Sequence, residues 1–312
     1  MRDPLVLVSS VTDDQLSQIR AAVPDATVER VDGDQLEERI DGAHVVAGTV
    51  TAASLARASK LAWVHSWAAG PNNQVFPEMV ASPVMLTCSK GNGAIPLAEH
   101  AIMLMLMLNR DALAWLRAQD ERRWARHTHA ELNGLTCGII GLGYSGVDLA
   151  QKAKAFHMEV LGVRRNAQPT PYVDEVYAPG DLHQILPRVD FLVVTAPYTK
   201  ETHGMLGAEE FKAMKTSAFY VNFSRGGIAD DEALLAALEN GWIAGAGIDA
   251  HGEEPLPAES PFWTAPNTII TPHNGATTPQ TRQRGVDIFV ENLVRFVTDQ
   301  PLTNLVDKEA GY

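Results

Sequence analysis

The amino-acid sequence predicts an α/β protein with two domains, each built around a parallel sheet. Its 312 residues exceed what a single core of typical size holds, which favours two domains. Short β-like runs alternate with helical patterns along nearly the whole chain, and this alternation is typical of parallel sheets covered by helices. Hydrophobic residues make up 46% and charged residues 20% of the chain, a composition that supports packed cores.

The first hundred residues supply one series of elements. We expect a strand at 5–8 and a helix at 12–23, where Thr12 and Gln15 have the spacing of a capping box. A further helix is expected at 52–58. The other strands predicted in this series lie at 44–48, 61–65 and 84–88.

A long helix is expected to begin near Pro96, a favourable first-turn residue, and to run to about Trp124. It starts apolar and ends charged. Leu and Met are so dense at 102–108 that one helix face could not hide them all within a single domain. We therefore expect this helix to form a homodimer interface as well as part of the core.

A second α/β series follows this helix. Its predicted strands lie at 137–141, 159–163, 191–197, 218–224, 244–250 and 268–273. A final helix is expected at roughly 278–299, with Thr278 as its N-cap and Pro279 in its first turn.

Charge and cysteine content exclude several classes of function. A net charge of −13 argues against nucleic-acid binding, which requires a basic face. Cys88 and Cys137 are too few for a disulfide framework or a cysteine metal site, so we expect a reducing, cytoplasmic location and no metal. The longest apolar run, at 101–108, is far shorter than the ~20 residues of a membrane span, and no membrane association is expected.

Three glycines form the motif G-x-G-x-x-G between a predicted strand and a predicted helix. Gly141 would allow the tight turn, Gly143 would let the backbone approach a pyrophosphate, and Gly146 would let helix and strand pack closely. In this strand–turn–helix context the motif predicts a Rossmann-like dinucleotide-binding domain. The alternative is a tight α/β turn that binds no ligand.

The next strand ends in VLGVRRN, with Arg164 and Arg165 placed 23 and 24 residues after Gly141. An NAD-binding domain carries an acidic residue ~20 residues beyond the glycines, where it accepts hydrogen bonds from the ribose 2′-hydroxyl. Here no carboxylate follows until Asp174. Two guanidinium groups suit a 2′-phosphate, so the pair predicts a preference for NADP. The alternatives are that only Arg165 binds, or that both arginines are solvated on the surface.

Polar residues follow three further strands of the second series: Arg225, Glu254 and His273. Each has an ordinary structural alternative, as a surface arginine, a solvated acid in a turn, and a buried core histidine. Reduction of a ketone needs a proton donor that works near neutral pH, and histidine suits this role. A carboxylate on the other imidazole nitrogen would favour the imidazolium, and an arginine could hold a substrate carboxylate. The set predicts a 2-oxo acid as substrate.

Three stretches resemble, in order and spacing, the signature regions of the D-isomer-specific 2-hydroxyacid dehydrogenases: GIIGLGYSG, NFSRGGIADDEALLAALENGWIAGAGIDAHGEEPL and NTIITPHNGATTPQT. The segments HSWAAGPNN and AEHA are similar to the substrate-carboxylate loop and the start of the interdomain helix in that family. This resemblance covers nearly the whole chain. It implies two Rossmann-like or flavodoxin-like parallel-sheet domains with an active-site cleft between them. The substrate-binding domain would comprise residues 1–97 and 280–312, and the dinucleotide-binding domain residues 98–279.

The resemblance also implies the roles of individual residues. Arg225 would orient the substrate, His273 would act as acid and base, and Glu254 would be its partner. The residues expected to bind substrate are Ala69, Gly70, Arg225 and His273. The residues expected to bind the cofactor are Gly141, Gly143, Tyr144, Ser145, Gly146, Arg164, Arg165, Ala196, Pro197, Thr202, Phe223, Ser224, Asp249 and Gly275.

The implied activity is NAD(P)-dependent reduction of a small 2-oxo acid, such as glyoxylate or hydroxypyruvate, to the D-2-hydroxy acid. NADP is the expected cofactor and NAD a weaker alternative, while larger 2-oxo acids remain open as substrates. A dinucleotide-sensing protein like the family's transcriptional corepressors is the alternative from another class. A formate dehydrogenase relative would carry glutamine in place of Glu254. Two departures from the family pattern, Ala250 after Asp249 and Asn72 in the loop, remove no catalytic group.

Overall fold

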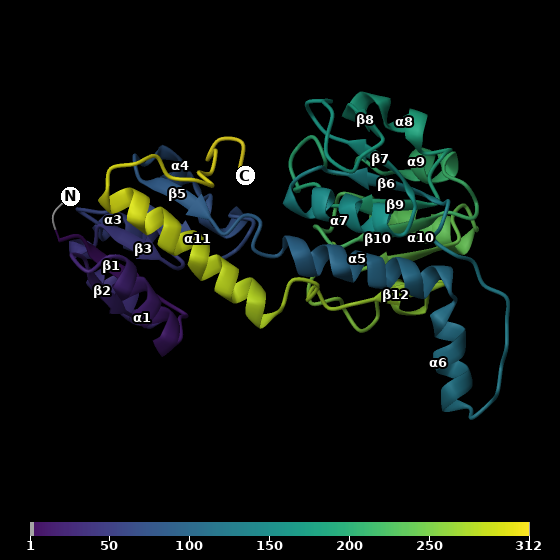
Figure 1. The fold of residues 1–312 in the computed structure, drawn as a ribbon, viewed down its shortest axis with the longest axis horizontal. Coiled ribbons are helices and arrows are strands. Elements are labelled where there is room, and N and C mark those ends of the chain that lie inside the picture. Colours follow the sequence, from purple (N-terminus) through teal and green to yellow (C-terminus); the bar gives the residue numbers. More distant parts are fainter. Residues whose placement is uncertain (1–2, 312) are drawn as a thin grey trace. The chain divides into compact units, whose positions relative to one another are not determined.

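The computed structural model describes residues 3–311 and divides the chain into two compact units (Figure 1). Unit 1 combines Met1–Gly93 with Thr278–Tyr312, and unit 2 is Ala94–Thr277. The sequence-based boundaries, after residues 97 and 279, fall close to these positions. No helix among the described residues is both long enough and apolar enough to cross a bilayer.

Within the described residues of unit 1, five parallel strands form one sheet in the order β2-β1-β3-β4-β5. This order is that of flavodoxin-like doubly wound sheets. The strands are β1 (Leu5–Val8), β2 (Thr27–Arg30), β3 (Val45–Ala47), β4 (Trp63–Ser66) and β5 (Met85–Cys88).

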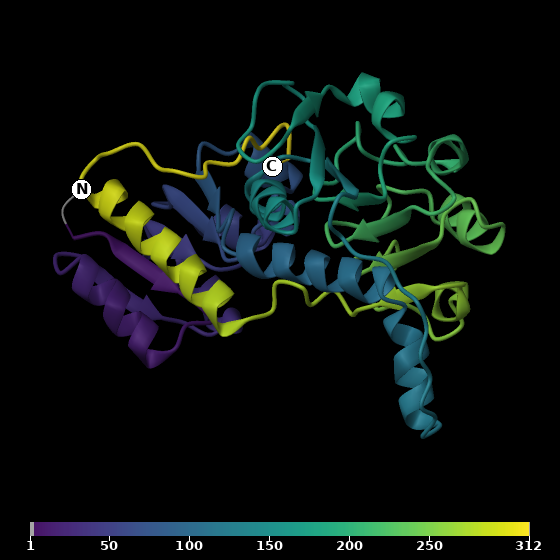
Figure 2. The ribbon, with the colours of Figure 1, turned by 45° about the vertical axis from the view of Figure 1, so that its right-hand side comes forward.

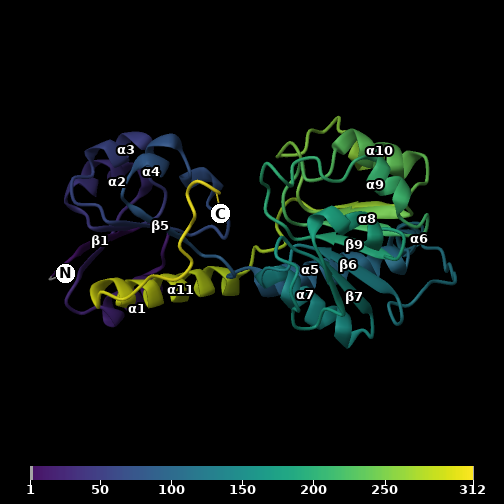
Figure 3. The same ribbon diagram turned by 90° about the horizontal axis from the view of Figure 1, so that it is seen from above.

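Helices cover both faces of this sheet, as Figure 3 shows. Alternate residues of β1 face opposite layers, with Val6 and Val8 in one hydrophobic cluster and Leu7 in the other. The helices α1 (Asp13–Ala22) and α11 (Pro279–Val297) contribute to the first cluster, which includes Phe289. The opposite face carries α2 (Gly33–Arg39), α3 (Ala52–Arg57) and α4 (Pro77–Ala81). The final segment of the chain therefore completes the core of unit 1.

Within the described residues of unit 2, seven parallel strands form one sheet in the order β12-β11-β10-β9-β6-β7-β8. The order reverses between β6 and β9, which is the switch point of a doubly wound sheet. The strands are β6 (Thr136–Ile140), β7 (Glu159–Val163), β8 (Glu175–Tyr177), β9 (Phe191–Val194), β10 (Phe219–Asn222), β11 (Gly245–Ile248) and β12 (Thr268–Ile270). Both sheets confirm the predicted fold class.

The faces of this second sheet are also covered by helices. Ile139 and Val193 belong to the cluster that includes residues of α5 (Ala94–Asn109) and α7 (Tyr144–Ala155). Ile140 and Val194, the next residues along the same strands, belong to the opposite cluster. That cluster includes residues of three further helices, α8 (Leu182–Ile185), α9 (Ala208–Ala213) and α10 (Asp231–Glu239).

The prediction of one long helix from Pro96 to Trp124 is wrong. The chain forms α5 and then α6 (Ala112–Asp120), with Asp111 between them in the left-handed conformation at φ 50°. Asp is one of the few residues that adopts this conformation at low cost, so a break here is physically reasonable. Figure 2 shows α6 turning away from the axis of α5.

The dense Leu and Met run of α5 is mostly buried within unit 2, against α7, β10 and β11. Leu104 and Met105 are fully buried, whereas Met103 is 40% exposed. The density of apolar residues therefore reflects burial on several sides of the helix, and it is not by itself a sign of a subunit interface.

Other local predictions had mixed outcomes. The capping box of Thr12 and Gln15 is confirmed, and the Thr278 hydroxyl accepts the Thr281 N–H as the N-cap of α11. The strands β2 and β8 and the helix α2 were not predicted. Both strands lie at sheet edges and carry charged residues, so they lack the apolar run by which the inner strands are recognised.

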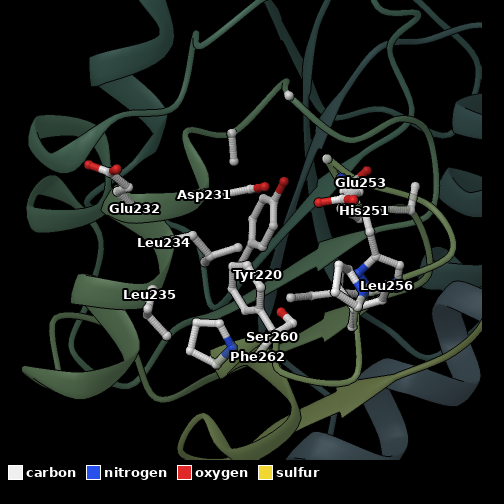
Figure 4. A pocket seen from close by; sticks show the side chains of 18 of the residues that line it. Tyr220, Asp231, Glu232, Leu234, Leu235, His251, Glu253, Leu256, Ser260 and Phe262 are labelled. Atoms are coloured by element: carbon white, nitrogen blue, oxygen red, sulfur yellow. Dashed lines mark hydrogen bonds between the residues drawn. The ribbon is translucent and has the colours of Figure 1, made fainter.

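Two buried side-chain atoms among the described residues of unit 2 lack a hydrogen-bond partner, Nδ2 of Asn109 and the hydroxyl of Tyr220. The hydroxyl of Tyr220, on β10, is fully buried and makes no hydrogen bond within residues 3–311. It lies at a cavity of about 380 Å³ that Asp231, His251 and Glu253 also line. Figure 4 shows the Tyr220 ring between Asp231 and the loop that carries His251 and Glu253.

We expect the substitution Tyr220→Phe to stabilise the protein, because an unsatisfied buried hydroxyl costs about 1 kcal/mol or more. For a unit of this size, that corresponds to a rise in thermal midpoint of about 2–4 °C in calorimetry. Tyr177→Phe is the matched control, since that hydroxyl hydrogen-bonds with Glu175 and Arg188 and its loss should not raise the midpoint. A lower midpoint for Tyr220→Phe would contradict the prediction.

Candidate active site

The candidate residues of unit 2 follow the carboxyl ends of strands in its sheet. Arg225 follows β10, Glu254 follows β11 and His273 follows β12, and these three strands are neighbours. The glycine-rich turn follows β6, and the two arginines follow β7. Because the strands are parallel, their carboxyl ends lie at one edge of the sheet, where doubly wound sheets bind ligands.

The glycine-rich turn is packed so closely that two of its positions require glycine. Gly141 has a φ of +102°, and a Cβ there would lie 2.6 Å from the backbone nitrogen of Ala196. A Cβ on Gly146 would lie 2.1 Å from the carbonyl oxygen of Gly141. A Cβ on Gly143 would meet no atom within 4 Å, so the space beside this residue is open.

This open space adjoins the start of a helix. Helix α7 begins directly after Gly143, and no side chain caps it. The N–H groups of its first turn, which includes Tyr144 and Ser145, are therefore available to an anion, and the helix dipole favours one there. The close turn, the open space and the uncapped helix together fit the pyrophosphate of a dinucleotide.

The residues predicted to contact the cofactor after β9 and β10 are linked by hydrogen bonds. The hydroxyl of Ser224 donates to the carbonyl of Ala196, and that of Thr202 donates to the carbonyl of Pro197 over 2.8 Å. Phe223 is buried in the cluster that includes residues of α5 and α7. These contacts fix the two loops against each other at the switch-point end of the sheet. That these five residues touch the cofactor stays a prediction.

The two arginines differ in their surroundings. Arg164 is half-buried, and its Nη1 donates to the hydroxyl of Thr170 over 3.2 Å. Arg165 is exposed. The guanidinium of Arg164 is therefore partly held by its own unit. Arg165 also interacts within the described residues: hydrogen bonds from Thr199 and the backbone lower the pKa of Glu201, and the charge of Arg165 adds to this effect.

Glu254 and His273 form the central pair of the site. Both carboxylate oxygens of Glu254 lie 2.8 Å from Nδ1 of His273, and the two side chains are 38% and 37% exposed. The backbone N–H of His251 also donates to Glu254, over 2.9 Å. Partial burial raises the pKa of Glu254, but the hydrogen bonds from His251 and His273 outweigh it and lower that pKa below its ordinary value. The carboxylate is therefore ionised beside the imidazole.

The loop that carries His273 is anchored by a buried carboxylate. Asp249 is fully buried and accepts hydrogen bonds from the Thr271 hydroxyl over 2.6 Å and from the N–H groups of Asn274 and Gly275 over 3.1 and 3.0 Å. His273, between these donors, has a φ of 51°. The predicted contact of Asp249 and Gly275 with the cofactor stays a prediction, but the hydrogen bond between them helps to hold the loop that carries His273.

His100 supports the same loop from α5. Its Nε2 lies 3.0 Å from the Thr271 hydroxyl and 3.6 Å from Asp249. Burial lowers the pKa of His100, although the charge of Asp249 partly opposes this effect. His100 thus has structural contacts and does not adjoin the Glu254–His273 pair.

Arg225 lies on a loop that packs against the segment leading to Glu254. Its Nη1 donates to the carbonyl of Ser224 over 2.8 Å, and its own carbonyl accepts a hydrogen bond from Asn222 over 2.9 Å. At the next residue, a Cβ on Gly226 would lie only 2.0 Å from the carbonyl oxygen of His251. The loops of Arg225 and Glu254 therefore touch through their backbones, and only glycine permits this approach.

In unit 1, the predicted carboxylate loop follows β4. The N–H of Ser89 donates to the carbonyls of Ser66 and Ala68 over 3.0 and 3.1 Å. Within residues 3–311, the N–H groups of Ala69 and Gly70 donate no hydrogen bond. Two successive N–H groups are thus available to an anion, as the prediction for Ala69 and Gly70 requires.

Three residues that position this site were not predicted from the sequence: Asn222, His251 and Thr271. Asn222 ends an apolar strand and Thr271 follows another, and a polar side chain at such an end is a signal that could have identified both. His251 acts on Glu254 through its backbone N–H, which no pattern of side chains reveals.

Comparison with known proteins identifies the family. The sequence model described as "D-isomer specific 2-hydroxyacid dehydrogenase, NAD binding domain" matches residues 102–275, more than half of the chain. A glyoxylate reductase of Korarchaeum cryptofilum is 33% identical over 261 residues, which cover 81% of this chain and 78% of that protein.

Solved structures agree over the full length. A D-isomer specific 2-hydroxyacid dehydrogenase family protein from Aeromonas salmonicida matches with a TM-score of 0.89 and 32% identity, covering 99% of this chain and 100% of that one. An NADPH-dependent glyoxylate/hydroxypyruvate reductase from Sinorhizobium meliloti, in complex with NADP and sulfate, matches with a TM-score of 0.85 and 28% identity over 100% of both chains. The chain belongs to the D-isomer specific 2-hydroxyacid dehydrogenase family.

Proposed function

We propose that this protein reduces a small 2-oxo acid to the corresponding D-2-hydroxy acid, with NADPH as its preferred cofactor. The observation that carries the proposal is the Glu254–His273 pair, held at the ends of adjacent strands with the Arg225 loop beside it. The pair supplies a proton donor with a fixed ring and a charged partner, which is what reduction of a ketone requires.

In this proposal, bound NAD(P)H supplies the hydride that adds to the carbonyl carbon of the substrate. His273 donates the proton to the carbonyl oxygen as charge develops there. Its Nδ1 is engaged by Glu254, so Nε2 is the nitrogen left to donate. The ionised Glu254 stabilises the imidazolium and fixes the orientation of the ring.

Each unit, taken by itself, offers donors that suit an acid group. The guanidinium of Arg225 can hold a carboxylate through two parallel hydrogen bonds and polarise the adjacent carbonyl. Ala69 and Gly70 present two N–H groups that no other described residue uses, and these suit a carboxylate oxygen. The substrate class follows from these donors, since both sets favour a carboxylate.

Glyoxylate and hydroxypyruvate are the substrates we propose first. The similar proteins from Korarchaeum cryptofilum and Sinorhizobium meliloti are a glyoxylate reductase and a glyoxylate/hydroxypyruvate reductase. The test is the loss of NADPH absorbance when each 2-oxo acid is added to the purified protein. Product chirality is then determined for hydroxypyruvate, because glycolate is not chiral. An absence of turnover with every 2-oxo acid in a panel of increasing size would overturn the proposal.

A dinucleotide-sensing protein without turnover is the weaker candidate. Such a protein would need the glycine-rich turn but not a proton donor with a bonded carboxylate. The intact pair of Glu254 and His273 therefore supports an enzyme. The glutamate at position 254 also argues against a formate dehydrogenase relative, which would carry glutamine there.

The cytoplasmic location stays a prediction. Its support is chemical: Cys88 and Cys137 are both free thiols, as expected for a reducing compartment.

We predict that His273→Ala lowers kcat for glyoxylate by about two to four orders of magnitude, because the variant loses the proton donor, while the dissociation constant for NADPH stays nearly unchanged. His183→Ala is the matched control, since His183 forms a similar pair with Glu210 over 3.1 Å elsewhere in unit 2. Near-normal kcat in the His273 variant would refute the assignment.

The preference for NADPH is proposed from the end of β7. Arg165 is exposed there, and Arg164 has one described side-chain hydrogen bond, to a neutral hydroxyl. The next carboxylate along the chain, Asp174, accepts hydrogen bonds from Lys154 over 2.9 Å and from the N–H of Val160 over 2.8 Å. Asp174 is thus engaged elsewhere and does not replace the acidic residue that NAD-binding domains use for the ribose 2′-hydroxyl.

We predict that Arg165→Ala raises the KM for NADPH ten-fold or more, about 1.4 kcal/mol, and changes the KM for NADH little, because a guanidinium gains most from a charged phosphate. Arg164→Ala should have a smaller effect, since its side chain is half-buried whereas that of Arg165 is exposed to solvent. Lys212→Ala is the control, because it removes an exposed cation of the same unit that lies on α9 and not at the end of β7. Equal kcat/KM for NADPH and NADH in the unmodified protein would overturn the preference.

We also propose a homodimer, with an interface different from the one the sequence suggested. The exposed apolar side chains of this region lie on α6 and the segment after it: Trp115 is 38% exposed, Leu116 50% and Trp124 93%. They adjoin a hollow of about 470 Å³ lined by Trp115 and Trp124. In Figures 1 and 2, α6 projects from the rest of unit 2. The ring of Trp115 contacts His127 and His129, while Leu116 and Trp124 stay at least half exposed. A second copy would bury them.

Light scattering at micromolar concentration should give the mass of a dimer. Trp124→Ala should raise the dimer dissociation constant by ~30-fold, because a buried interface tryptophan is commonly worth about 2 kcal/mol. Tyr172→Ala, which removes a 49% exposed aromatic ring elsewhere on unit 2, should have no effect. A monomeric mass for the unmodified protein would exclude the dimer.

A further inference from the structure

The loop after β4 presents its N–H groups because its carbonyls are held from the other side. A trans peptide is planar, so its C=O and N–H groups point in opposite directions. The carbonyl of Ala68 shares a peptide with the N–H of Ala69, and the carbonyl of Ala69 shares one with the N–H of Gly70. Hydrogen-bond donors that fix these two carbonyls therefore also set the direction in which the two N–H groups point.

Both carbonyls are fixed by residues at the end of β5. The N–H of Ser89 donates to the carbonyl of Ala68 over 3.1 Å. The thiol of Cys88 donates to the carbonyl of Ala69 over 3.3 Å. The N–H groups of Ala69 and Gly70 consequently point away from the end of β5, and they donate to no described residue.

The donors themselves are held rigidly. The N–H of Cys88 donates to the carbonyl of Asn304 over 3.4 Å, and Thr87 forms a bridge with Leu305, so the C-terminal segment braces β5. The hydroxyl of Ser89 lies 3.1 Å from Nε2 of His65, which is fully buried. Burial lowers the pKa of His65 to about 3, so this ring is a neutral structural group.

We propose that Cys88 is a positioning residue for substrate binding: its thiol hydrogen bond to the carbonyl of Ala69 orients the N–H of Gly70 toward the substrate carboxylate. This inference rests on the proposed function of the loop. It assigns to a buried cysteine a role in recognising the acid group, although the sulfur does not touch the substrate.

The chemistry of the thiol suits this role. A thiol must keep its proton to donate, and burial raises the pKa of Cys88, with the Lys90 backbone and charge opposing the shift. The side chain is 2% exposed, which excludes it as a nucleophile or as a target of bulky reagents in the folded state. Because a thiol is a weak donor, its loss should loosen the loop without unfolding it.

The test compares Cys88→Ala with Cys88→Ser, whose hydroxyl can restore the hydrogen bond. We expect Cys88→Ala to raise the KM for glyoxylate and the dissociation constant for oxalate about three- to ten-fold, as for loss of one weak orienting contact. The kcat and the KM for NADPH should stay within about two-fold of the unmodified values. Cys88→Ser should recover most of the lost affinity for both acids.

Cys137→Ala is the matched control, because it removes the other buried thiol, on β6 of unit 2, and should leave the KM for glyoxylate unchanged. Turnover of glyoxylate with an unchanged KM in Cys88→Ala would overturn the inference alone. An equal rise of KM in Cys88→Ala and Cys88→Ser would also overturn it, since the effect would then be one of packing. No turnover by the unmodified protein would overturn the proposed function and the inference together.

Discussion

The buried carboxylate of Asp249 is the interaction on which the catalytic arrangement depends. A fully buried charge is tolerated only when hydrogen bonds replace its hydration, and this one receives the Thr271 hydroxyl and two backbone N–H groups. Those donors all belong to the loop after β12, so satisfying the carboxylate also sets the course of that loop. His273 is held between them at a positive φ, a conformation that isolated histidine rarely adopts. The hydrogen bonds that stabilise the buried carboxylate thus also position His273, the proposed proton donor.

Backbone contacts position the loops that follow β10 and β11. Gly226 lets the Arg225 loop approach the carbonyl of His251, and the N–H of that same residue binds Glu254. The loops after β10 and β11 therefore meet through main-chain atoms, and a side chain such as that of Ala250 can depart from the family pattern without disturbing that contact. The loop after β12 is held by side chains instead, those of Asp249, His251 and Glu254. Side-chain identity matters where a side chain must itself carry charge or a proton, as in Arg225, Glu254 and His273.

The fold was predictable from sequence because the inner strands of both sheets are apolar runs followed by polar residues, a pattern produced by burial on both faces. Edge strands such as β8 were not predictable from the sequence, because solvent on one side of the strand permits charged residues there. The break at Asp111 was not predicted, because a helical pattern of residues continues on both sides of it. Only the left-handed backbone conformation of Asp111 separates α5 from α6. In the site, the charged side chains were predictable from chemistry. The positioning contacts of Asn222, His251 and Cys88 were not predicted, because each has a backbone group as donor or acceptor and the pattern of side chains does not reveal which backbone groups are engaged.

A protein with a net charge of −13 must bind anionic ligands against its own long-range field. At physiological ionic strength that field is screened beyond about 8 Å, whereas contacts at hydrogen-bond distance are not. Recognition therefore falls to local donors, and the chain builds them from backbone as much as from side chains. The uncapped start of α7 after Gly143 and the outward N–H groups of Ala69 and Gly70 carry no net charge, yet each offers concentrated positive potential. Substitution of their own side chains by any residue except proline leaves such N–H donors in place. Their orientation depends instead on the residues that bind the carbonyls of the same peptides, such as Cys88 at the carbonyl of Ala69. By our inference, a buried thiol therefore affects the binding of an acid that it does not contact.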